Sequence, residues 1–309
     1  MADNNQANQF EVAIIGGGPA ALTAALYARR KELSTALIAK EIGGQLLWTN
    51  EIENYPGFSS ITGYELLKKF REHAREYEPQ EFIDETVLNV EKEGDLFQVE
   101  TDSGKGLQAH TLVVATGKRP RKLNVPGEEE YRGKGVSYCT TCDAPLYRDR
   151  KVAIIGGGDA AFEGIIDVLP IADKVYNINR SQPRAEPILQ KRVNEEEIQS
   201  YHDHQVLEIY GNDLVEGVKI EKQSDGSVQN IEVDGVFVEI GLIPNTEFIS
   251  HLVQTNERGE IVVDCDTRTS VKGIFGAGDV TTVPEKQVVI SAGEGAKAAL
   301  AAYRYLIRQ

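Results

Sequence analysis

The pattern of apolar and polar positions repeats once along the chain. Residues 12–18 and 152–158 both read VAIIGGG, an apolar run that leads into three glycines, and an alanine-rich segment with helical character follows each. A strand, a glycine-rich turn and a helix in this order predict a dinucleotide-binding βαβ unit. Because the pattern occurs twice, one domain's length apart, the chain is predicted to contain two such units.

The residue types within each turn suit a bound pyrophosphate. Gly16 permits the tight turn, Gly18 lets the backbone approach the phosphates, and the N-terminal end of the next helix favours negative charge. Alanine holds the third glycine position of the fingerprint in both copies, at Ala21 and Ala161. Its small side chain still allows close packing of the helix against the strand.

The hydrophobic pattern also predicts the other elements of the first unit. A helix over residues 19–29 leads to a strand over 35–39, and residues 63–78 have helical spacing. Alternating apolar residues between 82 and 101 predict a small antiparallel sheet that lies over the first unit. A further strand is expected over residues 111–115.

Strands and one long helix are predicted for the rest of the chain. Strands are expected over residues 174–178, 235–240 and 269–275, and an alanine-rich helix over 290–307. Small residues near the start of that helix would let a flat cofactor pack against its N-terminal end, where the helix dipole favours negative charge.

Two crossings between domains are predicted, near Pro120 and Pro244. The expected fold class is α/β, with two Rossmann-like dinucleotide-binding domains, the second inserted in the first, and small antiparallel sheets. Residues 1–117 and 246–309 would form the first domain and residues 118–245 the second.

Composition narrows the range of partners. The chain has 309 residues, 41% of them hydrophobic, and a formal charge of −15, which argues against nucleic acid or an anionic membrane as partner. An alternative is that the charge serves solubility alone. No stretch is long enough to span a membrane, and residues 1–9 are polar without a signal-peptide core, so we expect a cytoplasmic protein.

The candidate chemistry lies in the sequence CTTCD at residues 139–143. Two thiols separated by two residues can close a small disulfide, and the neighbouring carboxyl can carry the proton that thiol chemistry moves. A structural zinc site would need two more soft ligands, and the only other cysteine is Cys265. His202 and His204 are expected in a solvated turn. The sequence therefore predicts a redox centre and no metal.

The order of the motifs resembles that of the low-molecular-weight thioredoxin reductases across nearly the whole chain. The motifs are the first fingerprint, GGQ at 43–45, ENYPG at 53–57, ATG at 115–117, Cys-x-x-Cys-Asp, the second fingerprint, and GD at 278–279. The final section, with TVP at 282–284 and AGEGAKAA at 292–299, is similar to the flavoprotein subunit of bacterial alkyl hydroperoxide reductase. This resemblance implies an FAD- and nicotinamide-dependent disulfide reductase that passes electrons to a separate thioredoxin- or glutaredoxin-like protein. It also implies a homodimer.

The resemblance assigns roles to individual residues. Cys142 matches the thiol that meets the flavin, Cys139 the thiol that attacks the partner's disulfide, and Asp143 the acid that moves the proton. Residues that match positions around FAD are Gly16, Gly18, Gly44, Gln45, Asn54, Thr116, Gly117, Asp279, Gln287 and Val288. Further candidates for the FAD site are Pro19, Ala20, Glu41, Gly43, Leu46, Val87, Gly278 and Lys286. Matches to the nicotinamide-nucleotide site are Gly156, Gly158, Asp159, Ala160 and Glu163. The two crossings would be hinges between the domains.

The identity of the electron donor stays open. Arg180 and Arg184 could clasp a 2′-phosphate by charge-assisted hydrogen bonds, or they could be surface charges, while Asn179 offers a neutral contact to a ribose hydroxyl. NADPH-dependent thioredoxin reductases show His-Arg-Arg before Arg-Ala, whereas this chain has Asn179-Arg180-Ser181 with one residue fewer before Arg184. NADPH or NADH is expected, with reduced ferredoxin as an alternative.

Three other functions remain as alternatives. The chain could be a flavoprotein oxidase that passes electrons to oxygen, a peroxiredoxin-reducing component, or a nucleotide-binding regulatory protein without turnover.

Overall fold

This is a computed structural model, and it describes residues 8–48, 52–193 and 198–308. The described chain separates into two compact units. The first contains residues 8–47, 53–119 and 243–308, and the second is built on residues 120–193 and 198–242. The second unit is therefore formed by a segment inserted within the first.

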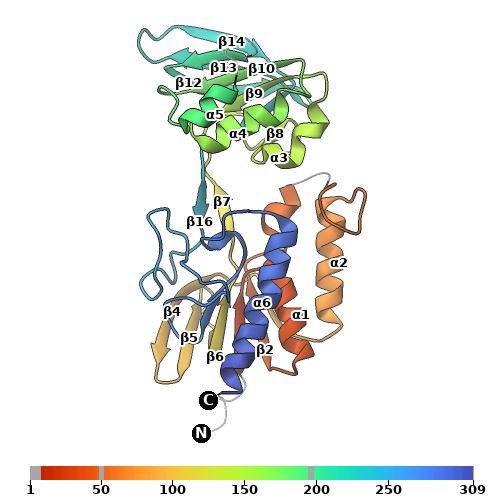
Figure 1. Ribbon diagram of the computed structural model, residues 1–309, viewed down its shortest axis with the longest axis vertical. Helices are drawn as coiled ribbons and strands as arrows, with labels where there is room; N and C mark the ends of the chain where they lie inside the picture. The colour runs from red at the N-terminus through yellow and green to blue at the C-terminus, as the bar shows by residue number, and fades with distance from the viewer. Residues whose placement is uncertain (1–7, 49–51, 194–197, 309) are drawn as a thin grey trace. The chain divides into compact units, whose positions relative to one another are not determined.

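A seven-stranded sheet forms the centre of the first unit (Figure 1). Its strands are β1 (Gln9–Ile15), β2 (Thr35–Ala39), β3 (Gln80–Ile83), β4 (Val87–Glu93), β5 (Leu96–Thr101), β6 (Gly106–Val114) and β17 (Ile274–Gly276). The order is β3-β2-β1-β6-β5-β4, and β17 also pairs with β6. The sheet is parallel except at β4 and β5. Most of β1 and all of β2 are buried, as expected for parallel strands that are covered on both faces.

The predicted position of the antiparallel strands was wrong. Strands β4 and β5 do not form a separate sheet over the first unit, because β5 pairs with β6 and extends the main sheet. Phe97 and Val99 of β5 belong to the same core cluster as Phe10 of β1 and Leu112 of β6. Burial of these side chains explains why the hairpin joins the edge of the sheet.

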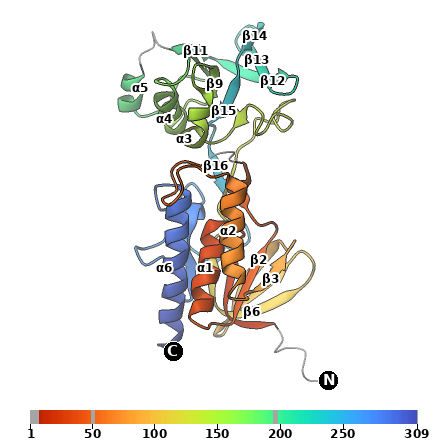
Figure 2. The same cartoon turned by 90° about the vertical axis from the view of Figure 1, so that its right-hand side faces the viewer.

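Three helices pack side by side in the first unit: α1 (Pro19–Arg30), α2 (Gly63–Arg75) and α6 (Val288–Leu306). Figure 2 shows α1 between the other two. The contact between α1 and α6 is close, because a Cβ atom at Gly295 would lie 2.1 Å from the carbonyl oxygen of Ala20. Helix α2 begins with a capping box formed by Thr62 and Glu65. All three predicted helices are confirmed.

A five-stranded parallel sheet forms the second unit, in the order β11-β10-β9-β15-β8. Its strands are β8 (Val136–Ser137), β9 (Lys151–Ile155), β10 (Lys174–Asn179), β11 (Ile198–His202) and β15 (Gly235–Val238). Its helices are α3 (Thr140–Asp143), α4 (Asp159–Val168) and α5 (Pro187–Arg192).

An antiparallel sheet of three strands also belongs to this unit: β12 (His204–Gly211), β13 (Val215–Lys222) and β14 (Val228–Glu232). The sequence analysis did not locate it. Val206, Val218 and Ile231 on these strands share a core cluster with Tyr176 and Ile178 of β10. The α/β class with two Rossmann-type sheets and small antiparallel pairings is thus confirmed.

Two predicted strands are shorter than expected. Strand β17 covers only Ile274–Gly276, because Gly273 has a φ of 91° and makes a turn before it. Strand β15 ends at Val238, two residues early. The connections between the units are β7 (Lys118–Pro120) and β16 (Leu242–Pro244), which pair with each other.

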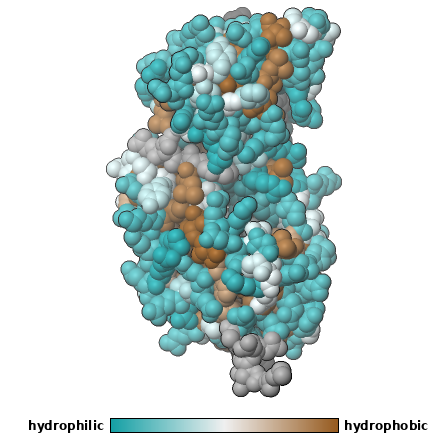
Figure 3. Space-filling view, turned by 180° about the vertical axis from the view of Figure 1, so that it is seen from behind, coloured by the Kyte–Doolittle hydropathy of each residue, from teal (hydrophilic) through white to brown (hydrophobic). Residues whose placement is uncertain are grey.

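The surface seen from behind is mostly hydrophilic, with small hydrophobic streaks (Figure 3). No helix in the described ranges has both the length and the apolar character needed to cross a bilayer. Most of the polar N-terminal segment, residues 1–7, lies outside the described residues.

Candidate active site

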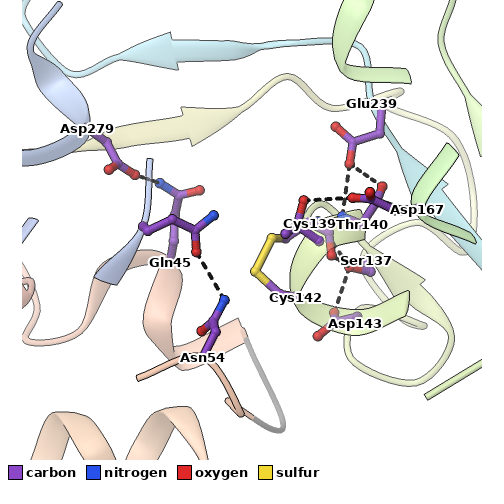
Figure 4. The surroundings of a disulfide bond; sticks show 12 residues. Gln45, Asn54, Ser137, Cys139, Thr140, Cys142, Asp143, Asp167, Glu239 and Asp279 are labelled. Atoms are coloured by element: carbon purple, nitrogen blue, oxygen red, sulfur yellow. Dashed lines mark hydrogen bonds between the residues drawn. A yellow bond between two sulfur atoms is a disulfide. The ribbon is translucent and has the colours of Figure 1, made fainter. Parts of the chain in front are cut away.

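Cys139 and Cys142 form a disulfide at the start of α3 (Figure 4). Their Cα atoms are 5.3 Å apart, and both residues are half-buried. Cys139 immediately precedes the helix, and its carbonyl oxygen accepts a hydrogen bond of 3.2 Å from the N–H of Asp143. The helical turn therefore holds both sulfur atoms and the neighbouring acid in one compact arrangement.

Asp143 is buried beside the disulfide. Its Oδ2 accepts a hydrogen bond of 2.7 Å from Oγ of Ser137, and the same Oγ accepts one of 3.1 Å from the N–H of Cys139. Its Oδ1 is buried and has no hydrogen-bond partner among the described residues. Burial raises the pKa of Asp143 above its usual value, and the bond from Ser137 opposes this only in part. A carboxyl that holds its proton more tightly is suited to exchange a proton with a thiol.

A second acid, the half-buried Glu239, contacts the same turn and was missed by the sequence analysis. Its Oε1 accepts hydrogen bonds from the N–H (3.1 Å) and the Oγ1 (2.6 Å) of Thr140. Burial raises the pKa of Glu239 to about 7. Glu239 is a single acid after the apolar run of β15, so no sequence motif indicated it.

The second glycine-rich turn lies between β9 and α4. A Cβ atom at Gly156 would lie 2.2 Å from the carbonyl oxygen of Glu239, whereas at Gly158 nothing lies within 4 Å. The first glycine is therefore required by packing, and the third leaves an open face beside the first turn of α4. Ala160 and Glu163 are exposed on α4, and Asp159 accepts a hydrogen bond of 2.8 Å from the N–H of Glu186.

The side chain of Asn179, at the end of β10, is buried and already engaged. Its Nδ2 donates to Oδ1 of Asn177 (2.7 Å), and its Oδ1 lies 2.9 Å from Nδ1 of His202. Arg180 and Arg184 are exposed, and neither forms an ion pair within the described part of the chain. The two arginines thus remain available to a ligand at this strand end.

The expectation of a solvated turn at residues 202–204 was wrong for the histidines. Asp203 makes a tight turn with a φ of 62°, but His202 and His204 are half-buried at the ends of paired strands. Nδ1 of His204 lies 2.6 Å from the carbonyl oxygen of His202. No cluster of three or more potential metal ligands is found in the described ranges.

The first glycine-rich turn, between β1 and α1, repeats the geometry of the second. A Cβ atom at Gly16 would lie 2.2 Å from the carbonyl oxygen of Ala115, and at Gly18 the nearest atom would be 4.0 Å away. The carbonyl oxygen of Glu41 would lie 2.1 Å from a Cβ at Gly17, and the Glu41 side chain is exposed. The backbone of Glu41 thus shapes the turn.

Several predicted FAD contacts meet in the first unit. Asp279 accepts hydrogen bonds from Nε2 of Gln45 (3.1 Å, Figure 4) and from Oγ of Ser291 (3.2 Å). Burial raises the pKa of Asp279, against the opposing charge of Lys286. Asn54 donates to Oε1 of Gln287 (3.2 Å), so residues from opposite ends of the chain come together.

The remaining candidates are distributed over several elements of the first unit. Thr116 donates to the carbonyl oxygen of Asn245 (2.7 Å), and at Gly44 and Gly117 an added Cβ would meet no atom within 4 Å. The others are Pro19 and Ala20 at the start of α1, Gly43 and Leu46 in the loop after β2, Val87 at the start of β4, Gly278 beside Asp279, and Val288 at the start of α6. Open glycines and the half-buried acid Asp279 fit a cofactor with phosphates and a polyol chain, as FAD has.

Two dinucleotide-type units and a disulfide with its own acid define a disulfide oxidoreductase of the flavin and nicotinamide type. The chain belongs to the pyridine nucleotide-disulphide oxidoreductase family, whose sequence pattern matches residues 10–298. This family implies FAD and a nicotinamide nucleotide as cofactors.

Two relatives that are equally similar to this chain carry different names. The chain is 40% identical over 310 residues to an alkyl hydroperoxide reductase subunit from Escherichia coli, covering 98% of this chain and 60% of that protein. It is also 40% identical over 301 residues to a Bacillus subtilis protein named NADH dehydrogenase, covering 97% of this chain and 59% of that protein. The chain thus spans about 60% of the length of these relatives.

Similar solved structures include thioredoxin reductases. The Streptococcus pyogenes thioredoxin reductase matches with a TM-score of 0.91 and 39% identity, covering 98% of this chain and 99% of that one. The Giardia duodenalis thioredoxin reductase matches with a TM-score of 0.90 and 33% identity, covering 97% and 99%. Both the class of low-molecular-weight thioredoxin reductases and the similarity to the alkyl hydroperoxide reductase flavoprotein are confirmed.

Proposed function

We propose that this chain is a thioredoxin-disulfide reductase that passes electrons from a nicotinamide nucleotide through FAD and the Cys139–Cys142 disulfide to a small thioredoxin- or glutaredoxin-like protein. The observation that carries the proposal is the disulfide beside a buried acid, Asp143, in the unit that also holds the second glycine-rich turn. We also propose that the first unit binds FAD and the second unit binds the nicotinamide nucleotide.

The proposed roles follow from chemistry. When bound against Gly18, Gly117 and Asp279, FAD supplies the two-electron chemistry that links a nicotinamide to a disulfide. In the reduced pair, the thiolate of Cys139 attacks the partner's disulfide and forms a mixed disulfide. Cys142 then attacks Sγ of Cys139, restores the original bond and releases the partner as a dithiol. Asp143 takes the proton from the attacking thiol and returns one to the leaving sulfur.

NADPH is the donor that the second unit favours. Arg180 and Arg184 are exposed beside the end of β10, in a chain with a net charge of −15, and each can offer a guanidinium to a 2′-phosphate. The side chain of Asn179 is occupied by Asn177 and His202 and is less able to serve a ribose hydroxyl. Replacement of both arginines with alanine should raise the KM for NADPH more than the KM for NADH.

A homodimer is proposed through the first unit. A groove of about 330 Å³ lies between α1, α2 and α6. Its lining includes Leu22, Leu26, Tyr55, Phe70, Val289 and Ala292. A second copy of the chain would cover this apolar surface. Light scattering should give the mass of a dimer for the parent protein and of a monomer for Leu26→Arg, and a monomeric parent would refute the assignment.

A second candidate is a peroxiredoxin-reducing component. It is favoured by the 40% identity to the Escherichia coli alkyl hydroperoxide reductase protein, of which this chain spans 60%. In that case electrons from the Cys139–Cys142 pair would reach a peroxidase through a separate thioredoxin-like domain or protein. The two candidates differ in the final acceptor and share the chemistry of the pair.

The test is an anaerobic titration of the purified protein. NADPH or NADH is added in separate experiments, and reduction is followed by the flavin absorbance. Bleaching by either nucleotide, followed by reduction of added thioredoxin, supports the proposal. If Cys139→Ser no longer reduces thioredoxin but its flavin is still bleached, the disulfide is the group that passes electrons to thioredoxin. If dithionite bleaches the flavin and neither nucleotide does, the proposed donor is wrong and ferredoxin is tested next. Unchanged turnover with oxygen in Cys139→Ser would indicate an oxidase.

A further inference from the structure

Glu239 fixes the turn that carries the disulfide to the end of strand β15. Its Oε1 accepts two hydrogen bonds from Thr140, at 3.1 Å from the N–H and 2.6 Å from Oγ1. Figure 4 shows this carboxyl pointing at Thr140, which directly follows Cys139. Thr140 is only 3% exposed, so its side of the contact is shielded from water. Glu239 itself is half-buried, so a carboxyl charge at this place acts on the neighbouring turn with only partial solvent screening.

Packing keeps this contact in place from two sides. Helix α4 approaches Thr140 so closely that a Cβ atom at Gly164 would lie 2.7 Å from Oγ1 of Thr140. The backbone of Glu239 is held by a hydrogen bond of 2.8 Å from its N–H to the carbonyl oxygen of Ile155 in β9. The side chain of Thr140 and the backbone of Glu239 are therefore each held by the surrounding core.

We propose that Glu239 is a positioning residue that makes the Cys139–Cys142 pair more reducing. Reduction breaks the Sγ–Sγ bond with two electrons, and it yields two thiols on uptake of two protons, or a thiol and a thiolate on uptake of one. A nearby carboxylate disfavours the thiolate, raises the thiol pKa and so destabilises the reduced pair. A less stable dithiol gives its electrons more readily to a partner, so the inference rests on the proposed function and deepens it.

The size of this effect should depend on pH. Burial and, to a smaller extent, the charges of Glu163 and Asp167 on α4 together raise the pKa of Glu239 to about 7, against the two hydrogen bonds from Thr140. The carboxyl therefore gains its charge as the pH rises through neutrality. Its influence on the pair should be small at acid pH and grow as the pH rises through about 7.

The experiment equilibrates the purified holoprotein with mixtures of reduced and oxidised dithiothreitol, alkylates free thiols and counts them by mass. Cys265 is exposed and free, and its alkylation at every ratio provides an internal reference. In Glu239→Gln, the ratio of dithiol to disulfide should rise about tenfold at pH 7, which is about 30 mV for a two-electron couple. The pKa of the more reactive thiol, from the pH dependence of its alkylation rate, should fall. Neither the ratio nor the thiol pKa requires a nicotinamide nucleotide or a protein partner. A negative result for Glu239 can therefore be told apart from a failure of the proposed reductase function.

Asp167→Asn is the matched control. Asp167 is exposed and accepts a hydrogen bond of 3.1 Å from Oγ1 of Thr141, one residue further along the turn. Because water screens this carboxylate, and because loss of its charge leaves Glu239 slightly more ionised, its removal should not raise the ratio. The proposal would be overturned by an unchanged ratio in Glu239→Gln or by a shift equal to that of the control. It would also be overturned by a shift that does not grow between pH 6 and pH 8.

A second variant keeps the test open if Glu239→Gln does not fold. Thr140→Val keeps the carboxyl but removes its hydroxyl donor, so more of Glu239 is protonated at pH 7 and the ratio should move in the same direction. A ratio equal to that of the parent protein would refute the role of Glu239.

Discussion

The hydroxyl of Ser137 donates a hydrogen bond of 2.7 Å to Oδ2 of Asp143, and it accepts a hydrogen bond of 3.1 Å from the N–H of Cys139. This one side chain orients the acid relative to the first cysteine. Ser137→Ala removes the bond that partly counters burial, so the pKa of Asp143 should rise further. Because Asp143 then stays uncharged to a higher pH and opposes the neighbouring thiolate less, the pH at which alkylation of the reduced pair reaches half its maximal rate should move downward, and the rate at pH 7 should rise roughly threefold to tenfold.

Thr141→Ala provides the control for Ser137→Ala. Thr141 lies on the same turn but is exposed, and its hydroxyl donates to Asp167 and not to Asp143. Its alkylation profile should match that of the parent protein. An unshifted profile in Ser137→Ala would show that Ser137 does not act through the acid.

Alanine at the two ends of the second glycine-rich turn should have opposite effects. At Gly156 a Cβ atom would lie 2.2 Å from the carbonyl oxygen of Glu239, and the φ of 150° disfavours any side chain, so Gly156→Ala should lower the melting temperature by several degrees. At Gly158 the φ is −97° and the site is open, so Gly158→Ala should fold normally and bind the nucleotide at least tenfold more weakly. Thermal unfolding and calorimetric titration distinguish these outcomes. Normal nucleotide affinity in Gly158→Ala would mean that the phosphates do not approach this turn.

Glu260 in the first unit should make the stability of the folded protein sensitive to acid. This carboxyl pairs with Lys118, and both side chains are about one-tenth exposed. Burial raises the pKa of Glu260, but hydrogen bonds from Lys118 and Asn256 outweigh burial and lower it. The pair therefore stabilises the folded state above the unfolded pKa, near 4.5, and this contribution is lost as the pH falls through the lower folded value.

The matching variant is Glu260→Gln, which leaves Lys118 buried without its counter-charge. It should reduce the free energy of unfolding by about 2–4 kcal/mol at pH 7 and by much less at pH 3. Urea titrations at both pH values measure the difference. A loss that is equal at pH 7 and pH 3 would indicate that packing, and not the charge of Glu260, is responsible.

Sequence patterns were most informative where local geometry decides the structure. The repeated VAIIGGG became strand, turn and helix in both units, because Gly16 and Gly156 are each required by a carbonyl oxygen that would clash with a side chain. The Cys-x-x-Cys spacing led to a disulfide for the same reason, since a single helical turn brings the two sulfur atoms together.

Features that depend on contacts distant in sequence were missed or misplaced. Glu239 contacts Thr140, which lies 99 residues earlier in the sequence, and no residue pattern around Glu239 predicts that contact. His202 was assigned to solvent because its neighbours are polar, yet Asn179 on the adjacent strand binds it. The alternation between residues 82 and 101 predicted strands correctly, but it could not predict that β5 would pair with β6.

The burial of Glu239 should also be visible as a cost in stability. Its folded pKa is about 7 against a usual value of 4.5, so the unfolded chain releases this proton at lower pH and folding becomes less favourable as the pH rises through this range. Glu239→Gln carries no such proton, so its stability relative to the parent protein should increase between pH 5 and pH 8, by at most about 3 kcal/mol. Urea unfolding of both proteins across this range measures the difference. A difference that does not vary with pH would mean that Glu239 titrates near its usual value, and the neutral-pH dependence expected for the disulfide would then be absent as well.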